Sequence, residues 1–191
     1  MVILLALLLA SCSAFGGNET GAPIGSYLPL QVGNMWAYRS VDTTSSGQHW
    51  VDTVRVFGTA EIDGAHYVMY GGESRPRYVR TSGDSSVMEM APLGWGALGE
   101  IPWLLFDLKD GSTYQYRKFA EWGYTVTVSR GVRVETPSGV FEDCIRFDFY
   151  QAPPEEDAFS YTLAPGVGVV AHRPRSVGEF RLSGFTLMKS N

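Results

Sequence analysis

From Tyr27 onward, apolar and polar side chains alternate with a period close to two. The pattern is clearest at residues 124–128 (YTVTV), 145–149 (IRFDF) and 159–163 (FSYTL). A segment with this period forms a strand with one buried and one solvated face, as in antiparallel sheets. Turn signals such as the Asp-Gly pair at residues 63–64 separate the segments. The alternation therefore predicts an all-β fold.

Further strands follow from the same pattern, and two regions interrupt it. We expect these strands at residues 35–41, 49–59, 66–71, 76–81, 86–90, 113–119, 131–136, 167–172 and 179–188. Residues 91–108 contain two prolines and three glycines, so we expect a long connection there, with one helical turn. The sequence PPEED at residues 153–157 is typical of a solvated acidic loop.

One spacing in the chain occurs twice. The motif L-x-x-G-x-x-[WY]-x-Y starts at Leu30 and returns at Leu108, 78 positions later. At the same offset, the sequence VRV at residues 54–56 returns at residues 132–134. Internal repeats indicate duplicated structural units, although short β segments also resemble one another by chance. We expect residues 24–191 to form a single domain, a strongly curved antiparallel sheet or open barrel of two similar halves.

The start of the chain has the features of an export signal. Residues 2–10 are an unbroken apolar run, which is too short to span a bilayer as a helix of about 20 residues. Its length suits the apolar region of a signal peptide. The LASC sequence at residues 9–12 resembles the lipobox of bacterial lipoproteins, in which the bond before the cysteine is cut and the thiol is lipidated. The alternative is an ordinary signal peptide that leaves Cys12 as a free thiol.

The lipobox resemblance implies a lipid anchor. It divides the chain into a lipoprotein signal peptide at residues 1–11, a flexible tether at residues 12–23 and the β domain. The tether is small, polar and rich in glycine. Several acyl chains on Cys12, each stabilised by about 0.8 kcal/mol per buried CH₂, would hold the protein stably at a membrane. Ser13 after the cysteine implies the outer membrane, with the domain facing the periplasm.

The chemically reactive residues form no recognisable catalytic or metal-binding motif. The histidines lie in separate expected strands and lack a metal-ligand spacing such as H-E-x-x-H: His49, His66 and His172. The GDSS sequence at residues 83–86 sits between two β segments, so we expect a turn there. We assign no catalytic residue, no metal and no cofactor, and we expect that the protein is not an enzyme. A hydrolase with a dispersed site is the least favoured alternative.

Aromatic side chains are the remaining candidates for a binding function. Six of them are candidates to line a ligand site: Trp36, Tyr38, Trp95, Trp103, Tyr114 and Tyr116. The tryptophans Trp95, Trp103 and Trp122 are also candidates for a platform that stacks sugars. The alternative is that all these rings belong to the core, because aromatic residues dominate β cores and cross-strand pairs.

Three segments of the chain resemble those of a family of uncharacterised bacterial envelope lipoproteins. They are YLPLQVGNMWAY at residues 27–38, ETPSGVFEDC at residues 135–144 and LAPGVGVV at residues 163–170. The resemblance implies a β-rich fold and an envelope location. In layout, the chain is more distantly similar to lipoprotein carriers, whose curved antiparallel sheet holds acyl chains.

These features together predict a membrane-anchored lipoprotein with a non-catalytic binding or envelope-structural role. In this prediction the β domain holds a hydrophobic ligand, such as a lipid, in a cavity. The alternative is a glycan-binding envelope module that uses exposed tryptophans. The formal net charge of −5 gives no support for a nucleic-acid partner, which would need a basic face.

Overall fold

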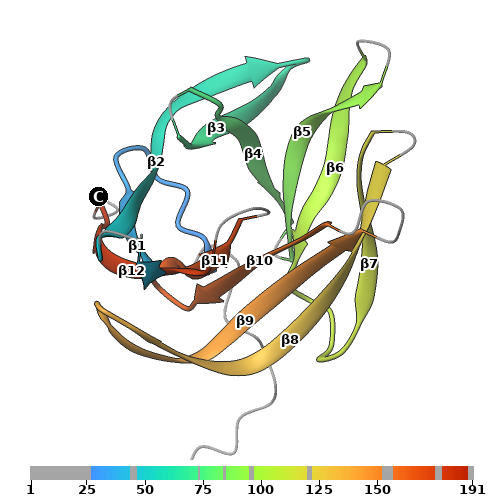
Figure 1. Cartoon of the computed structure of the whole chain (residues 1–191). Helices are drawn as coiled ribbons and strands as arrows, with labels where there is room; N and C mark the ends of the chain where they lie inside the picture. The colour runs from blue at the N-terminus through green and yellow to red at the C-terminus, as the bar shows by residue number, and fades with distance from the viewer. Residues whose placement is uncertain are drawn as a thin grey trace, which may run out of the picture.

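The protein folds as two antiparallel meanders of strands, which follow one another along the chain (Figure 1). The computed structural model describes residues 27–43, 47–72, 74–83, 85–94, 97–119, 122–151, 157–174 and 178–188. The first meander contains β1 (Met35–Thr43), β2 (His49–Ile62), β3 (Ala65–Gly71), β4 (Arg77–Ser82), β5 (Ser86–Gly94) and β6 (Ala97–Leu105). The second contains β7 (Thr113–Phe119), β8 (Trp122–Thr136), β9 (Gly139–Gln151), β10 (Asp157–Ala164), β11 (Gly168–Arg173) and β12 (Phe180–Thr186).

The N-terminal segment cannot be compared with its prediction. Cys12, the expected signal peptide and the expected tether lie outside the described residues. Within the described ranges, no helix has the length and apolar character needed to cross a bilayer.

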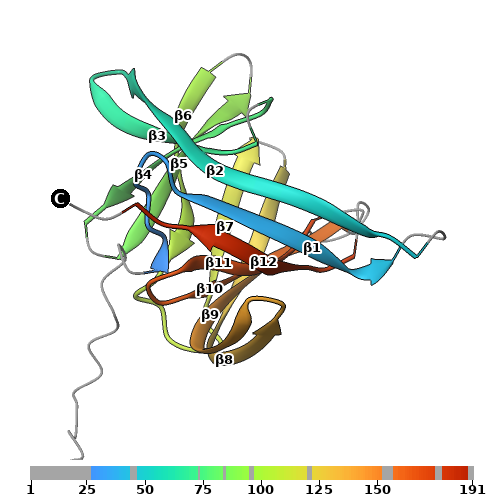
Figure 2. The same cartoon turned by 90° about the vertical axis from the view of Figure 1, so that its left-hand side faces the viewer.

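β1 and β12 join the two meanders into one twelve-stranded sheet with the order β6-β5-β4-β3-β2-β1-β12-β11-β10-β9-β8-β7. The sheet curls until its end strands β6 and β7 approach each other, as Figure 1 and Figure 2 show. In the described part of the chain no main-chain ladder pairs these two strands. Across the gap, the Tyr114 hydroxyl donates to the Trp103 carbonyl at 2.5 Å. The fold is a nearly closed barrel with one unsealed seam, which confirms the predicted all-β, strongly curved antiparallel architecture.

The turn that leads into β1 has a counterpart before β7. The Gly33 N–H donates to the Val56 carbonyl at 2.8 Å, and the Gly111 N–H donates to the Val128 carbonyl at 2.8 Å. In each turn the valine N–H donates back to the carbonyl of the residue after the glycine, at 2.9 Å. Both glycines have a positive φ, 98° and 75°, which glycine adopts without a steric cost. The repeated motif therefore forms the same local structure at the start of each half.

The second part of the repeat, the VRV sequence, does not occupy equivalent positions in the two halves. Because Gly111 pairs with Val128, the counterpart of Val56 is Val128 rather than Val134. The β7–β8 pairing is correspondingly shifted: Tyr38 lies opposite Asp52, whereas Tyr116 lies opposite Tyr124. The VRV sequence at residues 132–134 lies farther along β8, so its match to residues 54–56 does not mark an equivalent position.

The expected connection at residues 91–108 is wrong, because most of it forms a hairpin. β5 extends to Gly94, and β6 pairs with it from Ala97 to Leu105. Pro92 and Pro102 lie in these strands near irregularities of the register. β6 is an edge strand, where a missing N–H is tolerated. The prolines and glycines therefore mark bulges and a sheet edge rather than a loop.

The sequence SRG at residues 129–131 is a turn signal between two of the expected strands, but the structure has no turn there, since β8 continues through it. The register of β8 against β9 shifts between Ser129 and Val132, and Gly131 has a φ of 65°. A bulge of this kind bends a strand and increases its twist. Beyond it, the hairpin of β8 and β9 curves back along the outside of the sheet (Figure 2). We call residues 130–144 the arm.

Trp36 and Tyr38 anchor β1 in the interior of the barrel. Both side chains are fully buried. The Trp36 indole N–H donates to the Val167 carbonyl at 2.6 Å, and the Tyr38 hydroxyl donates to the Val169 carbonyl at 3.0 Å. A Cβ at Gly168 would lie 3.0 Å from Trp36 Nε1. The first and last segments of the family resemblance therefore pack directly against each other.

Candidate functional site

An ion pair lies inside the barrel at the level of β4 and β5. Arg77 lies opposite Tyr70 in the β3–β4 pair, on the same face as the core residue Val79. Its Nη1 donates to Glu89 Oε2 at 2.9 Å, and its Nη2 donates to the Tyr161 hydroxyl oxygen at 2.9 Å. Glu89 is only 2% exposed, so the pair places a carboxylate in the core.

Aromatic rings surround this pair and connect the two halves of the barrel. The Tyr116 hydroxyl donates to Glu89 Oε2 at 2.8 Å. The Arg77 guanidinium carbon lies 4.9 Å from the centre of the Trp103 ring and 5.8 Å from that of Tyr161. Both contacts are within the range of a cation–π interaction. We call these residues the internal cluster: Arg77, Glu89, Trp103, Tyr116 and Tyr161. The cluster joins β4, β5 and β6 to β7 and β10.

The protonation states of the cluster follow from burial and from the neighbouring charges. Burial alone would lower the pKa of Arg77, but Tyr161 and Glu89 outweigh it and raise the pKa above its ordinary value. Burial, followed by the charge of Glu89, raises the pKa of Tyr116 well above its usual range. Arg77 is therefore charged and Tyr116 is a hydrogen-bond donor near neutral pH. The pair is costly to bury unless its hydrogen bonds are satisfied.

The cluster contains N–H and O–H groups that its internal hydrogen bonds do not use. Among the described residues, the indole N–H of Trp103 is buried and has no partner. The Arg77 side chain remains 26% exposed, and its bonds to Glu89 and Tyr161 use one hydrogen on each η nitrogen. Because the Tyr161 oxygen accepts from Arg77, its own hydrogen is left to donate. The internal cluster therefore suits a group that accepts hydrogen bonds.

His172 and Asp52 form a second polar pair. The Nε2 atom of His172 is 3.6 Å from Asp52 Oδ2, beyond the length of a normal hydrogen bond. The ring stacks on Phe180, with 5.2 Å between centroids, and meets the edge of Tyr38. Burial lowers the pKa of His172, although the charge of Asp52 opposes it. The nearby Ser40 hydroxyl donates to the Asp42 carbonyl, so it does not form the hydrogen bond of a nucleophile to a base.

The structure disperses the other reactive residues expected from the sequence. His49 and His66 are exposed in separate strands. No group of three or more histidine, cysteine, aspartate or glutamate residues within the described ranges could hold a metal ion. Cys144 is fully buried and free, so it packs as a small core residue.

Most of the candidate ligand-lining residues lie in the core. Trp36, Tyr38, Trp103 and Tyr116 have almost no exposed surface, and Tyr114 is half-buried at the seam. Trp103 therefore offers no outer face on which a sugar could stack. Trp95 and the side chain of Trp122 lie outside the described residues.

The structure brings other residues to these sites that the sequence analysis did not select. Arg77, Glu89 and Tyr161 form part of the internal cluster; away from it, Trp50 is 60% exposed near the start of β2. A signal for Glu89 was available, because it stands two positions after Val87 and therefore on the same face of the strand expected at residues 86–90. Alternation places Tyr161 on a buried face, but it gives no signal for the contact with Arg77, which depends on which strands face each other across the barrel.

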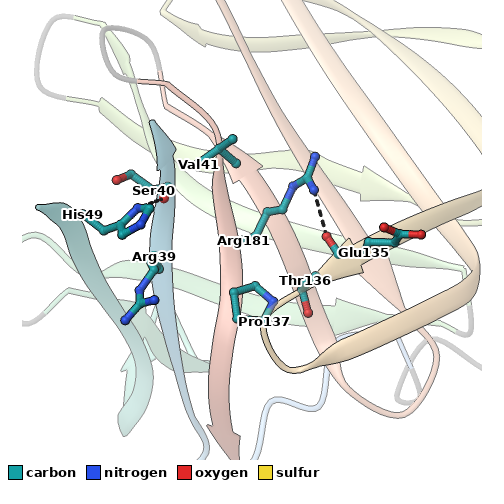
Figure 3. A pocket seen from close by; sticks show the side chains of 8 residues that line it. All are labelled: Arg39, Ser40, Val41, His49, Glu135, Thr136, Pro137 and Arg181. Atoms are coloured by element: carbon teal, nitrogen blue, oxygen red, sulfur yellow. Dashed lines mark hydrogen bonds between the residues drawn. The ribbon is translucent and has the colours of Figure 1, made fainter. Parts of the chain in front are cut away.

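Two pockets on the outside of the sheet adjoin the arm. The larger, about 370 Å³, is open and is lined by residues of β1, β2, β12 and the tip of the arm (Figure 3): Arg39, Ser40, Val41, His49, Glu135, Thr136, Pro137 and Arg181. The smaller, about 160 Å³, lies beneath the arm and shares Glu135 and Arg181 with the first. Figure 3 shows Arg181 reaching across to the arm, where its Nη1 donates to the Glu135 carbonyl at 3.0 Å.

The fold and its interior define a nearly closed antiparallel β-sheet protein with an aromatic core that encloses an ion pair. No protein-family model matches the chain, and no curated protein matches it. Two solved structures are similar. One is a protein from Bacteroides fragilis with a YmcC-like fold, proposed to be exported, with a TM-score of 0.44 and 14% identity. The other is a proposed lipoprotein from Parabacteroides distasonis, with a TM-score of 0.45 and 11% identity. Each comparison covers 84% of this chain and 99% of the other.

Proposed function

We propose that the protein is a lipid-anchored lipoprotein of the bacterial envelope with a non-catalytic binding role. The support is the order of features at the start of the chain: an apolar run, the LASC sequence that ends at Cys12, and a glycine-rich tether. Acylation of Cys12 would hold the β domain at the outer membrane, on its periplasmic side. The domain that follows is then a binding module on a tether.

Within this role, the interior of the barrel receives the hydrophobic part of a ligand. The observation that carries the proposal is the internal cluster, in which Arg77 and the Trp103 indole present spare donors among aromatic rings. A barrel that needed only a core would gain little from this arrangement, because burying charges and unpartnered polar atoms costs free energy. An acceptor group on an amphipathic ligand would satisfy these donors.

The chemistry of the cluster favours an uncharged acceptor on that ligand. Arg77 and Glu89 already neutralise each other at 2.9 Å. A ligand carboxylate would add an uncompensated charge beside Glu89, whereas an ester or amide carbonyl would accept hydrogen bonds without one. The expected ligand is therefore an acyl ester or amide lipid, whose chains contact the aromatic rings.

The test is to extract the full-length protein natively from membranes and to identify the lipids that copurify by mass spectrometry. We expect acyl lipids at a stoichiometric level, and a reduced level in an Arg77→Met/Glu89→Met variant. The matched control is Arg80→Met, because Arg80 lies on the other face of β4 and binds Glu100 through its Nη2 at 2.7 Å. Protein that carries no lipid, or a double variant that retains as much lipid as the control, would contradict the proposal.

A further inference from the structure

The arm covers the outer face of the sheet and encloses the smaller of the two pockets. After the bulge at Gly131, it passes above β11 and β12. Its tip is fixed to β12 by two hydrogen bonds: the Ser138 N–H donates to the Leu182 carbonyl at 3.2 Å, and Arg181 donates to the Glu135 carbonyl at 3.0 Å. The pocket of about 160 Å³, which we call the arm pocket, lies between this arm and the sheet.

The floor of the arm pocket carries the hydroxyl groups of two largely buried residues. Ser160 and Thr162 alternate along β10 with the core residues Phe159 and Leu163, so they face outward. They are nevertheless only 8% and 6% exposed, because the arm lies above them. Neither hydroxyl forms a hydrogen bond to another residue of the described chain. Both residues are thus more than nine-tenths buried, and their hydroxyl oxygens keep their remaining exposed surface toward the pocket.

The rim of the arm pocket carries arginines that neighbouring carboxylates hold in place. These are Arg133, bound to Glu135 and Glu142, Arg146, bound to Asp148, and Arg181, bound to Glu179, with N–O distances from 2.6 to 3.0 Å. In each case these contacts leave N–H groups that can donate to a ligand. Since every arginine is paired with a carboxylate, the rim combines donors and acceptors without a strong excess of either charge.

The walls of the arm pocket are apolar. Val132 and Val134 face it from the arm, and Ala171 faces it from β11. A wholly apolar ligand would cover the Ser160 and Thr162 hydroxyls without giving them partners, which is unfavourable. A small anion would meet the carboxylates of the rim. A neutral saccharide unit satisfies both constraints, because its hydroxyls donate and accept while its ring presents an apolar face.

We propose that the arm pocket binds one unit of a neutral saccharide, with the Ser160 and Thr162 hydroxyls at its base. The adjoining open pocket shares Glu135 and Arg181 with it, so the following units of a chain would lie there. This site is separate from the interior of the barrel and does not depend on a lipid ligand. It places glycan recognition on a polar pocket of the outer sheet rather than on tryptophans.

The first test measures binding by saturation-transfer NMR and then by calorimetry. The panel contains glucose, maltose, maltotetraose, N-acetylglucosamine and chitotetraose, with glucuronic acid as a charged counterpart. We expect at least one neutral series to bind, the tetrasaccharide more tightly than the single unit, and glucuronic acid more weakly than glucose. Failure of every neutral sugar to bind at millimolar concentration, or binding of glucuronic acid alone, would overturn the proposal.

The second test locates the binding site. Thr162→Val removes one hydroxyl at nearly constant volume and is expected to weaken binding about fivefold to tenfold. The control is Thr59→Val, which changes an exposed threonine of β2 and should leave the affinity unchanged. Ala171→Leu fills the pocket and keeps the hydroxyls, so it should abolish binding while circular dichroism remains that of the unaltered protein. Equal affinities for Thr162→Val and Thr59→Val, or full binding by Ala171→Leu, would refute this location.

Discussion

The internal ion pair offers the sharpest test of how the barrel is stabilised. Arg77→Met removes the cation and leaves Glu89, which is 2% exposed, with the Tyr116 hydroxyl as a remaining donor. Breaking a buried pair by removing one partner typically costs about 3–5 kcal/mol of unfolding free energy. Because Arg77 itself is 26% exposed, water can reach the site and we expect a loss near 3 kcal/mol.

The pH dependence of this loss has a definite sign. Without the charge of Arg77, the buried carboxylate of Glu89 is expected to bind a proton more readily in the folded than in the unfolded chain. The folded state then holds more protons than the unfolded state, so the free energy of unfolding falls as pH rises. The deficit of Arg77→Met should be small near pH 4, close to the ordinary titration range of glutamate, and should grow toward pH 8.

The assay is urea unfolding at several pH values, followed by circular dichroism. The double variant Arg77→Met/Glu89→Met removes both charges, and replacement of a buried pair by apolar side chains is often neutral or stabilising. We therefore expect it to be more stable than Arg77→Met alone at pH 8. A deficit that does not change with pH, or a double variant less stable than the single one, would refute the reasoning.

Three further predictions concern other parts of the chain. Gly168→Ala places a Cβ about 3 Å from the Trp36 indole at a φ of 105°, and we expect it to lower the free energy of unfolding by about 2–4 kcal/mol in chemical unfolding. In Gly166→Ala, at a φ of 75°, the Cβ would lie in open space. This variant should therefore lose only the part of that free energy that comes from the strained backbone conformation. Cys12→Ala should move the protein from the membrane to the soluble fraction and abolish incorporation of labelled palmitate, whereas retention in the membrane would contradict the anchor. Burial, then the charges of nearby acidic residues, raises the pKa of Cys144 to about 11, so its thiol should resist Ellman's reagent at pH 8 until the protein is unfolded in urea.

The strands were predictable from the sequence because their signal is local. Alternation gives the buried face of a strand without knowledge of its partners, and the segments at residues 145–149 and 159–163 indeed form parts of β9 and β10. The Pro-Ser-Gly sequence at residues 137–139 likewise marks the turn between β8 and β9, where Thr136 pairs with Gly139. Such features depend on a few consecutive residues.

The same reasoning did not predict the bulges, because a bulge and a turn carry the same local sequence signals. Gly131 has a positive φ that a turn would also require, yet β8 continues through it because β9 supplies partners on both sides. Pro102 interrupts an apolar run as a loop would, yet β5 pairs with it from one side, and on the other side no strand of the described chain forms a ladder with it. Whether such a residue ends a strand depends on neighbours that are distant in the sequence.

The candidate sites were less predictable than the strands. Arg77 follows Pro76 at the start of an alternating segment, where an arginine is typical of a solvated edge. It points inward because Tyr161, 84 positions later, lies across the barrel and accepts its hydrogen bond. Ser160 and Thr162 likewise look like ordinary solvent-facing residues of β10 until the arm covers them. Each site arises from a contact between elements far apart in the chain.

The repeated architecture explains why the internal cluster lies where it does. A closed barrel of two similar halves has two junctions, and the pairing of β1 with β12 seals one of them with main-chain hydrogen bonds. The other junction, between β6 and β7, has no such ladder among the described residues. There, the Tyr114–Trp103 and Tyr116–Glu89 hydrogen bonds connect the halves through side chains. Because side-chain hydrogen bonds can separate without disrupting a strand, the seam is the part of the barrel best suited to open for the lipid that we propose at Arg77.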